Sequence, residues 1–336
     1  MKNEQLHNVL VIRLSALGDV AMTIPAIYSV ARTYPGTVFH VVTTTFCAQL
    51  FVNAPQNVVL RPVETPVTTW HVLRQVSRLP VDAVADLHNV LRSWVVDAMF
   101  LLRGKPVSML NKHRQERRAI LKRGKVTTSP FVYRYFDVFT ALGLPCKPCF
   151  DTVFSVQPPL PIDIKKGGWY WIGIAPFARY QNKTYPINKM QEVVRLLAAQ
   201  LDVHIFLFGS HGQQAAMLSH WESLSPRIHC VAGRYTLYEE LSLMAHLDLM
   251  LSMDSANMHL ASIVSTRVVS VWGSTTPACG FYGWGWRQDD AICLNLDCQP
   301  CTIGGSHSCR IGGLNCLRGI SPETIVQRVI NSLKLR

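Results

Sequence analysis

The chain has 336 residues, of which 49% are hydrophobic and 16% charged, and its formal net charge at pH 7 is +12. At roughly 150 residues per domain, this length predicts two domains. The apolar content excludes a disordered chain, a coiled coil and a collagen-like repeat. No apolar stretch approaches the ~20 residues that span a bilayer, and the first apolar run, 9–12, is too short for a signal peptide. We therefore expect a cytoplasmic protein.

Short β-branched runs alternate with longer amphipathic segments along the chain, which is typical of parallel α/β units. In the first half the expected strands are 8–14, 38–43, 58–61, 83–87 and 106–110, and the expected helices include 21–32 and 90–102. A segment with three prolines and a Gly-Gly pair, 157–169, is interpreted as a linker. After it, the expected strands are 170–175, 203–208, 247–252 and 267–272, and the helices include 188–199 and 237–245. The pattern predicts two α/β domains, 1–160 and 161–336.

Positive charge is concentrated in the first half of the chain. Residues 1–160 hold 18 Lys and Arg against 9 Asp and Glu, and nine of these basic residues lie between Arg103 and Lys125 beside one acid, Glu116. Such a cluster attracts a polyanion, whether nucleic acid, anionic lipid headgroups or a phosphorylated glycan. The plain alternative is a solvated helix face.

Four of the ten cysteines lie near the C-terminal end. Cys298 and Cys301 have the spacing of a zinc knuckle, and Cys309 and Cys316 follow within fifteen residues. One interpretation is a structural zinc ion held by four thiolates. Because a second Cys-x2-Cys pair is missing, free thiols and disulfides remain open as alternatives.

Candidate chemistry lies at strand-to-loop junctions, because ligands of open parallel sheets bind at the carboxyl ends of the strands. The first junction, 14–19, ends in Asp19, which is placed either to act as a general base or to cap the following helix. This segment lacks G-x-G-x-x-G, which disfavours a dinucleotide-dependent dehydrogenase.

Two further junctions lie in the second half. The segment 252–259 contains Asp254 and His259 at the start of an expected helix, where exposed N–H groups can bind a diphosphate. The alternative is a capped helix with a satisfied histidine. The segment 175–186 supplies Arg179 and Lys183, whose charges suit a phosphate or a leaving group.

Four groups of motifs, in this order along the chain, are together similar to one family. They are 9–19 with 23–26, 82–93, 254–261 with 271–277, and the cysteine-bearing tail 298–322. The chain resembles glycosyltransferase family 9, the lipopolysaccharide heptosyltransferases, over nearly its full length.

The resemblance implies a GT-B fold, with two Rossmann-like doubly wound domains that face a central cleft. It implies an inverting glycosyltransferase that takes heptose from ADP-heptose and transfers it to Kdo or heptose of the lipopolysaccharide inner core. Asp19 would be the base that deprotonates the acceptor hydroxyl, and no metal cofactor would be required.

The resemblance also implies binding residues. Those on the donor side would be Arg179, Lys183, Gln213, Asp254, Ser255, Ala256 and His259. The acceptor's phosphates and carboxylates would meet Arg92, Lys112, Arg114, Arg117 and Arg118 in the first domain. The chain departs from the family in having Ser255-Ala256 where Thr-Gly is common and Gln213 where a ribose-binding Glu is common.

The implied partners are the nucleotide sugar and an anionic glycolipid, met in peripheral contact with the cytoplasmic face of the inner membrane. An alternative from another class is a zinc-containing basic protein that binds nucleic acid. The basic stretch contains no Phe, Tyr or Trp for stacking on bases, so no nucleic acid is expected. A family 9 enzyme with another donor sugar or acceptor is the second alternative.

Overall fold

The computed structural model describes residues 6–123, 129–306 and 308–334. The chain divides into two compact units. The described residues of the first unit end at Lys112 and resume over Ser129–Ser155, while those of the second unit are His113–Arg123 and Val156 onward. The predicted boundary at 160 therefore lies close to the observed one. The observed division differs from the prediction in assigning 113–123 to the second unit.

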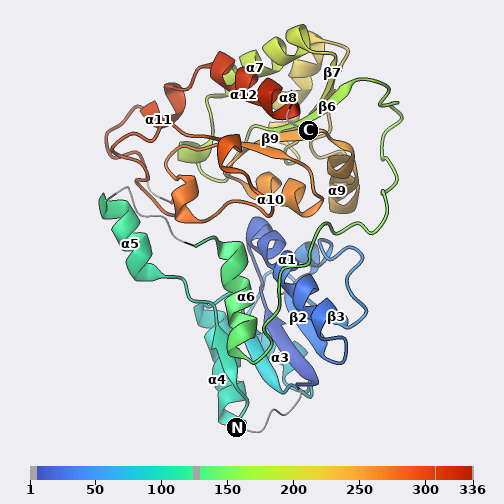
Figure 1. Cartoon of the computed structure of the whole chain (residues 1–336), viewed down its shortest axis with the longest axis vertical. Coiled ribbons are helices and arrows are strands. Elements are labelled where there is room, and N and C mark those ends of the chain that lie inside the picture. Colours follow the sequence, from blue (N-terminus) through green and yellow to red (C-terminus); the bar gives the residue numbers. More distant parts are fainter. Residues whose placement is uncertain (1–5, 124–128, 307, 335–336) are drawn as a thin grey trace. The chain divides into compact units, whose positions relative to one another are not determined.

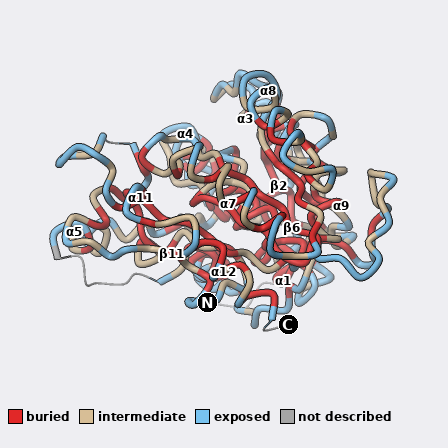
Figure 2. Tube along the Cα trace, turned by 90° about the horizontal axis from the view of Figure 1, so that it is seen from above, coloured by how far each residue is buried: buried red, intermediate tan, exposed pale blue. Residues whose placement is uncertain are grey.

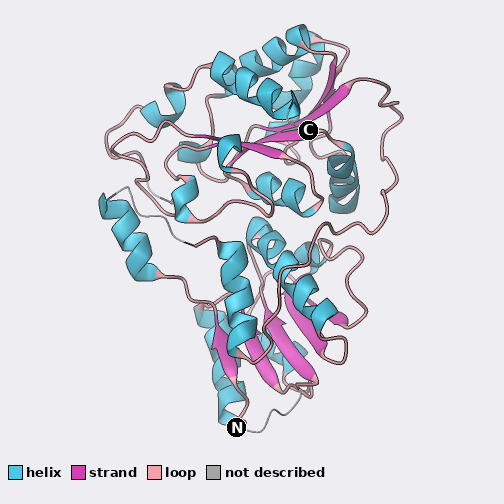
Figure 3. Ribbon diagram, viewed as in Figure 1, coloured by secondary structure: helices cyan, strands magenta, loops and turns pink. Residues whose placement is uncertain are grey.

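The first unit is a parallel sheet covered by helices (Figures 1 and 3). Its strand order is β3-β2-β1-β4-β5, and every neighbouring pair is parallel. The strands are β1 (Asn8–Ile12), β2 (Val38–Thr44), β3 (Val58–Val63), β4 (Ala83–Asp86) and β5 (Val107–Met109). The helices are α1 (Leu17–Thr33), α2 (Thr45–Ala48), α3 (Thr69–Val76), α4 (Leu91–Leu102) and α6 (Phe131–Ala141).

Successive side chains of a strand point to opposite faces of the sheet, and both faces of this sheet are apolar. Leu10 and Ile12 of β1 belong to one core cluster with Val72 of α3 and with Val96 of α4. The alternate residues, such as Val11, are equally buried, as expected for a parallel sheet covered on both faces. The order of the strands places β1 and β4 side by side, so the loops after them open at the same sheet edge.

The second unit contains a parallel sheet of order β11-β10-β9-β6-β7-β8. The strands are β6 (Tyr170–Ala175), β7 (Val203–Leu207), β8 (Ile228–Cys230), β9 (Leu249–Met253), β10 (Val268–Val271) and β11 (Ala291–Ile292). The α-helices are α5 (Arg114–Arg123), α7 (Ile187–Gln200), α8 (Gln213–Ser219), α9 (Leu237–His246), α10 (Ala256–Ile263), α11 (Asn315–Arg318) and α12 (Pro322–Lys334). Short 3-10 helices are η1 (Gln181–Lys183), η2 (His220–Leu224), η3 (Pro277–Cys279) and η4 (Gln288–Asp290).

The core of the second unit surrounds its central strands. Ile172 and Ile174 of β6 pack in one cluster with Val193 of α7 and Val329 of α12. Figure 2 shows buried residues along β6 and α7, whereas α8 has mostly exposed and intermediate residues. Helix α5 joins this unit because its apolar residue Ile120 is fully buried in a small cluster with Cys279 and Ile303.

Most elements expected from the sequence are confirmed, with ends that differ by a few residues. The largest shift is at α1, which begins at Leu17 instead of residue 21, so Asp19 lies inside its first turn. Strands β8 and β11, of three and two residues, were not predicted. The expected linker contains neither helix nor strand. Among the described residues, no helix has the length and apolar character to cross a membrane.

A buried ion pair ties α12 to the sheet of the second unit. Arg267 donates through Nε and Nη2 to the two carboxylate oxygens of Asp290, each at 2.8 Å. Its Nη1 donates to the carbonyl of Ser332, whose hydroxyl donates to Asp290. We expect Asp290→Ala to lower the free energy of unfolding by about 3–5 kcal/mol, because a buried guanidinium is left without its counter-ion.

Chemical denaturation measures this loss. The matched control is Glu192→Ala, which removes an exposed carboxylate paired with Arg195 and should change stability little. Equal midpoints for Asp290→Ala and the unchanged protein would contradict the structural role of the pair.

Candidate functional site

The first unit holds Asp19 at the edge where its sheet reverses its strand order. Asp19 lies in the first turn of α1, directly after β1, and its Oδ2 accepts a hydrogen bond from the N–H of Ala16 at 3.3 Å. The carboxylate is one-third exposed. It therefore caps the helix, which was the alternative interpretation, and still presents a charged oxygen at the ligand-binding edge of the sheet.

Arg13 fixes the position of this carboxylate. Its Nη2 lies 2.7 Å from Asp19 Oδ2, and its Nη1 donates to the carbonyl of Leu87 at 2.7 Å. Arg13 is only 6% exposed. It thus connects the loop after β1 to the loop after β4. Arg13 was not predicted as a site residue, although a cation directly after a buried strand was a visible signal.

Beneath Arg13 lies a buried pair of carboxyl groups. Asp86 Oδ1 accepts the N–H groups of His88 and Asn89 at 2.8 and 2.9 Å. Asp97 of α4 is hydrogen-bonded to Asp86, and burial, with the neighbouring Asp86 charge, raises the pKa of Asp97 to about 8. Asp97 is therefore protonated at neutral pH and can donate its proton to Asp86.

Neutral groups complete this environment. Burial raises the pKa of Tyr135 to about 12, so its phenol stays protonated. Burial, together with the charges of Arg13 and Lys112, lowers the pKa of His88 to about 3, so its imidazole is neutral. The Arg13–Asp19 ion pair thus lies beside neutral Tyr135 and His88, and the Asp86 carboxylate adds a further negative charge near Arg13.

The predicted acceptor-binding residues divide between the two units. Arg92 is exposed at the start of α4, and Lys112 Nζ donates to the carbonyl of Asn89 at 2.7 Å, so both belong to the first unit. The other three belong to α5 in the second unit, because α5 is anchored there through its buried apolar side; they are Arg114, Arg117 and Arg118. Lys125, the last residue of the predicted basic stretch, lies outside the described residues.

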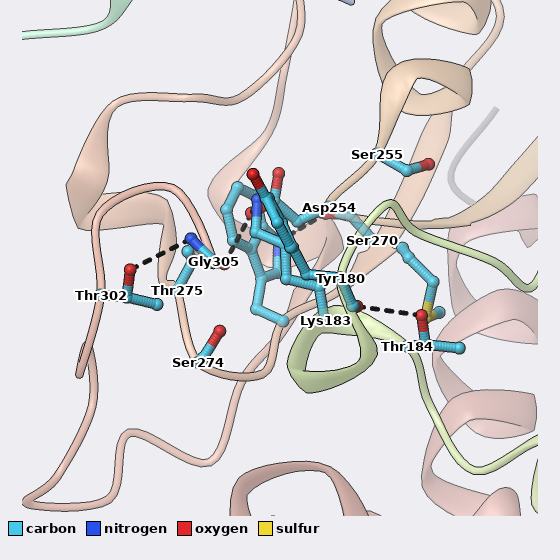
Figure 4. A network of polar contacts seen from close by, with 12 residues as sticks. Tyr180, Lys183, Thr184, Asp254, Ser255, Ser270, Ser274, Thr275, Thr302 and Gly305 are labelled. Atoms are coloured by element: carbon cyan, nitrogen blue, oxygen red, sulfur yellow. Dashed lines mark hydrogen bonds and ion pairs between the residues drawn. The ribbon is translucent and has the colours of Figure 1, made fainter. Parts of the chain in front are cut away.

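In the second unit, residues that follow three different strands form one polar cluster. Lys183 follows β6, Asp254 follows β9, and Thr275 follows β10. Figure 4 shows them together: Lys183 Nζ lies 2.7 Å from Asp254 Oδ2, and the hydroxyl of Thr275 donates to the same oxygen at 2.6 Å. Both charged side chains are about nine-tenths buried. Lys183 and Asp254, both placed at strand ends of one domain by the sequence, thus form an ion pair, whereas Thr275 was not singled out.

The start of α10 lies beside this cluster. Ser255 is the residue that precedes the helix, and its hydroxyl lies 3.1 Å from that of Ser252. Within the part of the chain that the structure describes, no side chain caps the first N–H groups of α10. Ala256 opens the helix, and His259 is buried one turn later. A helix end of this kind has N–H groups free for an anion.

Two other predicted donor-binding residues are peripheral in the second unit. Arg179 is exposed, and its guanidinium carbon lies 5.5 Å from the ring centre of Tyr180. Gln213 is the exposed first residue of α8, while its neighbour Gln214 accepts a hydrogen bond from the N–H of Ser210.

The cysteine-bearing tail forms one wall of the Lys183 cluster. Gly305 has a φ of +89° and donates its N–H to Thr302 Oγ1 at 3.1 Å. A Cβ at this position would come within 2.8 Å of Lys183 Cε and 2.9 Å of a ring carbon of Tyr180. Only glycine fits here without displacing the lysine side chain. This contact was not predicted from the sequence.

The four tail cysteines line a common cavity of about 320 Å³, together with Lys122 and Arg310; they are Cys298, Cys301, Cys309 and Cys316. All four are free thiols. Among the described residues, no three His, Cys, Asp or Glu side chains are arranged to hold a metal ion. The thiols of Cys301 and Cys309 point to the carbonyls of Ser274 and Gly312 instead. The structural zinc ion that the sequence suggested stays a prediction.

The raised pKa of Asp97 predicts a pH-dependent stability. The folded protein keeps this carboxyl protonated up to about pH 8, whereas the unfolded chain releases the proton near the ordinary pKa of 3.8. Folded molecules thus bind more protons between these values, and stability falls as pH rises through this window. In Asp97→Asn the amide can donate to Asp86 without titrating. We expect its Tm to fall less than that of the unchanged protein between about pH 5 and about pH 8.

Thermal melts across this range test the expectation. Asp137→Asn, which alters an exposed carboxylate of α6, is the control and should keep the original slope. Identical slopes for Asp97→Asn and the unchanged protein would show that Asp97 is not protonated in the folded state.

The Lys183–Asp254 pair predicts coupled stability losses. Asp254→Asn leaves a nine-tenths buried ammonium without its counter-ion, and we expect a loss of about 3 kcal/mol. Adding Lys183→Met should recover part of that loss, because the unpaired charge is removed. A double-mutant cycle read by chemical denaturation measures the coupling. Strictly additive losses would mean that the two charges do not stabilise each other.

Comparisons with known proteins agree with this architecture. The model of glycosyltransferase family 9 (heptosyltransferase) matches residues 69–308. Lipooligosaccharide heptosyltransferase 2 of Campylobacter jejuni is 20% identical over 330 residues, covering 95% of this chain and 96% of the relative.

Two solved Escherichia coli structures share the fold. Heptosyltransferase WaaC with ADP has a TM-score of 0.67 at 17% identity and covers 97% of this chain and 99% of its own. ADP-heptose lipopolysaccharide heptosyltransferase II has a TM-score of 0.65 at 18% identity, with coverage of 98% and 99%. The predicted GT-B fold of two parallel α/β domains is confirmed. With the family model matching more than half of its residues, the chain belongs to glycosyltransferase family 9, the heptosyltransferases, and is a glycosyltransferase.

Proposed function

We propose that this enzyme transfers heptose from ADP-heptose to the anionic inner core of lipopolysaccharide, at the cytoplasmic face of the inner membrane. The observation that carries the proposal is the Lys183–Asp254–Thr275 cluster beside the open start of α10. It lies where β6 and β9 adjoin, which is the point where the strand order of the second sheet reverses. Open α/β sheets bind nucleotides at such points.

Each donor-side residue has a role that its chemistry supports. The N–H groups at Ser255 and Ala256 would receive the diphosphate, with His259 one turn further along α10. Lys183 would neutralise the charge that develops on the leaving nucleoside diphosphate. Asp254 would accept hydrogen bonds from sugar hydroxyls. Arg179 would add positive charge at the rim, and Gln213 would hydrogen-bond a ribose hydroxyl.

On the acceptor side, Asp19 would act as the general base. Its carboxylate takes the proton of the acceptor hydroxyl while that oxygen attacks the anomeric carbon and the bond to the diphosphate breaks, which inverts the configuration. Arg13 would hold the carboxylate in place, since its Nη2 lies 2.7 Å from Asp19 Oδ2. Arg92 and Lys112, with the three α5 arginines Arg114, Arg117 and Arg118, would bind the acceptor's phosphates and carboxylates.

Replacing the base tests the catalytic assignment. We expect Asp19→Asn to lower kcat by about 10²–10⁴-fold, which is the usual contribution of general base catalysis, with little change in KM for the donor. The readout is ADP release from ADP-heptose in the presence of a lipopolysaccharide inner-core acceptor. Asp137→Asn on α6 is the matched control and should retain full turnover. Unchanged turnover in Asp19→Asn would remove the base assignment.

Ligand-induced stabilisation tests the donor class separately. At 100 times its dissociation constant a ligand stabilises the fold by about 2.7 kcal/mol, which thermal melts with ADP, UDP, GDP and NAD⁺ detect readily. Selective stabilisation by ADP supports the proposed donor. Selective stabilisation by UDP or GDP would be consistent with a glycosyltransferase but would show that the donor is not ADP-heptose.

A further inference from the structure

Helix α4 in the first unit is apolar on two sides. Its inner side packs against the sheet through Val96 and Phe100. Its outer side is also apolar, with Leu102 at 90% and Leu91 at 73% exposed. The exposed residues of this side follow the spacing of a helical stripe; they are Leu91, Trp94, Val95, Leu101 and Leu102. Exposed residues are visible along α4 in Figure 2.

Such a stripe needs a physical explanation. A helix on the surface of a globular protein normally turns charged and polar residues outward. The one acid of α4, Asp97, is instead buried on the inner side. Contiguous exposed apolar surface of this kind marks a place where another body binds.

The neighbouring helix extends the apolar surface. Helix α3 packs beside α4 on the same face of the sheet, where Val72 and Val96 share one cluster. Near its start α3 exposes Trp70, of which 70% is accessible. The indole of Trp94 is held in place by a hydrogen bond from its Nε1 to Asn89 Oδ1 at 2.7 Å. Trp94 is thus an exposed aromatic side chain held in a fixed orientation on α4, and Trp70 is an exposed one on the neighbouring helix.

The charge around these two helices identifies the kind of partner. Arg74 is exposed on α3, and Arg92 and Arg103 lie at the two ends of the α4 stripe. Across α3 and α4, both described in full, no exposed residue is acidic. An apolar face bordered by basic side chains matches the surface of an anionic bilayer, which offers hydrocarbon below a layer of negative headgroups.

We propose that the outer face of α4, with Trp70 of α3, inserts into the headgroup region of an anionic lipid bilayer. This inference rests on the proposed function, because it supplies the surface through which an enzyme of a lipid-linked acceptor would meet the membrane. An inserted apolar face predicts a different salt dependence of membrane binding from that of a purely electrostatic contact. Attachment by the basic stretch alone would be lost at high salt, whereas an inserted apolar face remains bound.

Flotation with lipid vesicles tests the inserted face. The whole protein is mixed with phosphatidylcholine vesicles that contain about one third phosphatidylglycerol, and a substantial fraction should stay bound in 1 M salt, where the Debye length is about 3 Å. Leu101→Gln/Leu102→Gln keeps good helix formers and removes two exposed leucines. We expect at least about a tenfold loss of vesicle partitioning.

The matched control removes two equally exposed aliphatic side chains elsewhere. Val156 and Ile311, in the second unit, are 74% and 64% exposed. Val156→Gln/Ile311→Gln should bind vesicles as the unchanged protein does. Equal binding by both double variants, or complete release of the unchanged protein at high salt, would overturn the proposal. A dimer in solution that only the α4 variant dissociates would also overturn the proposal. In that case a second copy of the chain, and not a bilayer, would cover the outer face of α4.

Measuring turnover together with vesicle binding distinguishes a failure of the membrane face from a failure of the proposed donor. With a delipidated core oligosaccharide as acceptor, Leu101→Gln/Leu102→Gln should keep its kcat, because α4's outer face touches no reacting group. A protein that binds vesicles but does not use ADP-heptose would refute the proposed donor and retain the membrane face. A protein that turns over but never binds vesicles would refute the membrane face alone.

Discussion

Parallel pairing of strands is the constraint on which the rest of this structure depends. In a parallel sheet every carboxyl end opens at one edge, so residues far apart in sequence become neighbours there. Lys183 and Asp254 are 71 positions apart, and they form an ion pair because β6 and β9 are adjacent. In the first unit the same pairing of β1 and β4 lets Arg13 reach the carbonyl of Leu87.

The buried charges of the two candidate sites are paired or neutralised. Arg13 pairs with Asp19, Lys183 pairs with Asp254, and Asp97 keeps its proton beside Asp86. Each arrangement avoids the free-energy penalty of an uncompensated ion in a medium of low dielectric constant. It also holds polar groups in fixed directions before any substrate arrives. Such preorganisation is what transition-state stabilisation requires of an active site.

The sequence predicted the strands, the two-domain architecture and the positions of Asp19, Lys183 and Asp254 at strand ends, because local periodicity carries that information. It did not predict the partners that make the site. The hydrogen bond from Thr275 depends on the placement of β10 beside β9, and the role of Arg13 depends on its burial. The assignment of α5 was missed for a similar reason. Its composition is basic, and one buried isoleucine determines where it packs.

The placement of α5 has a consequence for how the chain is built. Residues 113–123 belong to the second unit but are encoded between two segments of the first. A ribosome therefore completes α5 before it has made Cys279 and Ile303, the residues against which Ile120 is buried. A fragment that starts at Val156 would lack this helix and expose an apolar pocket at its site. Exchanging the second unit between relatives therefore means exchanging residues 113–123 as well, although they lie between the two segments of the first unit.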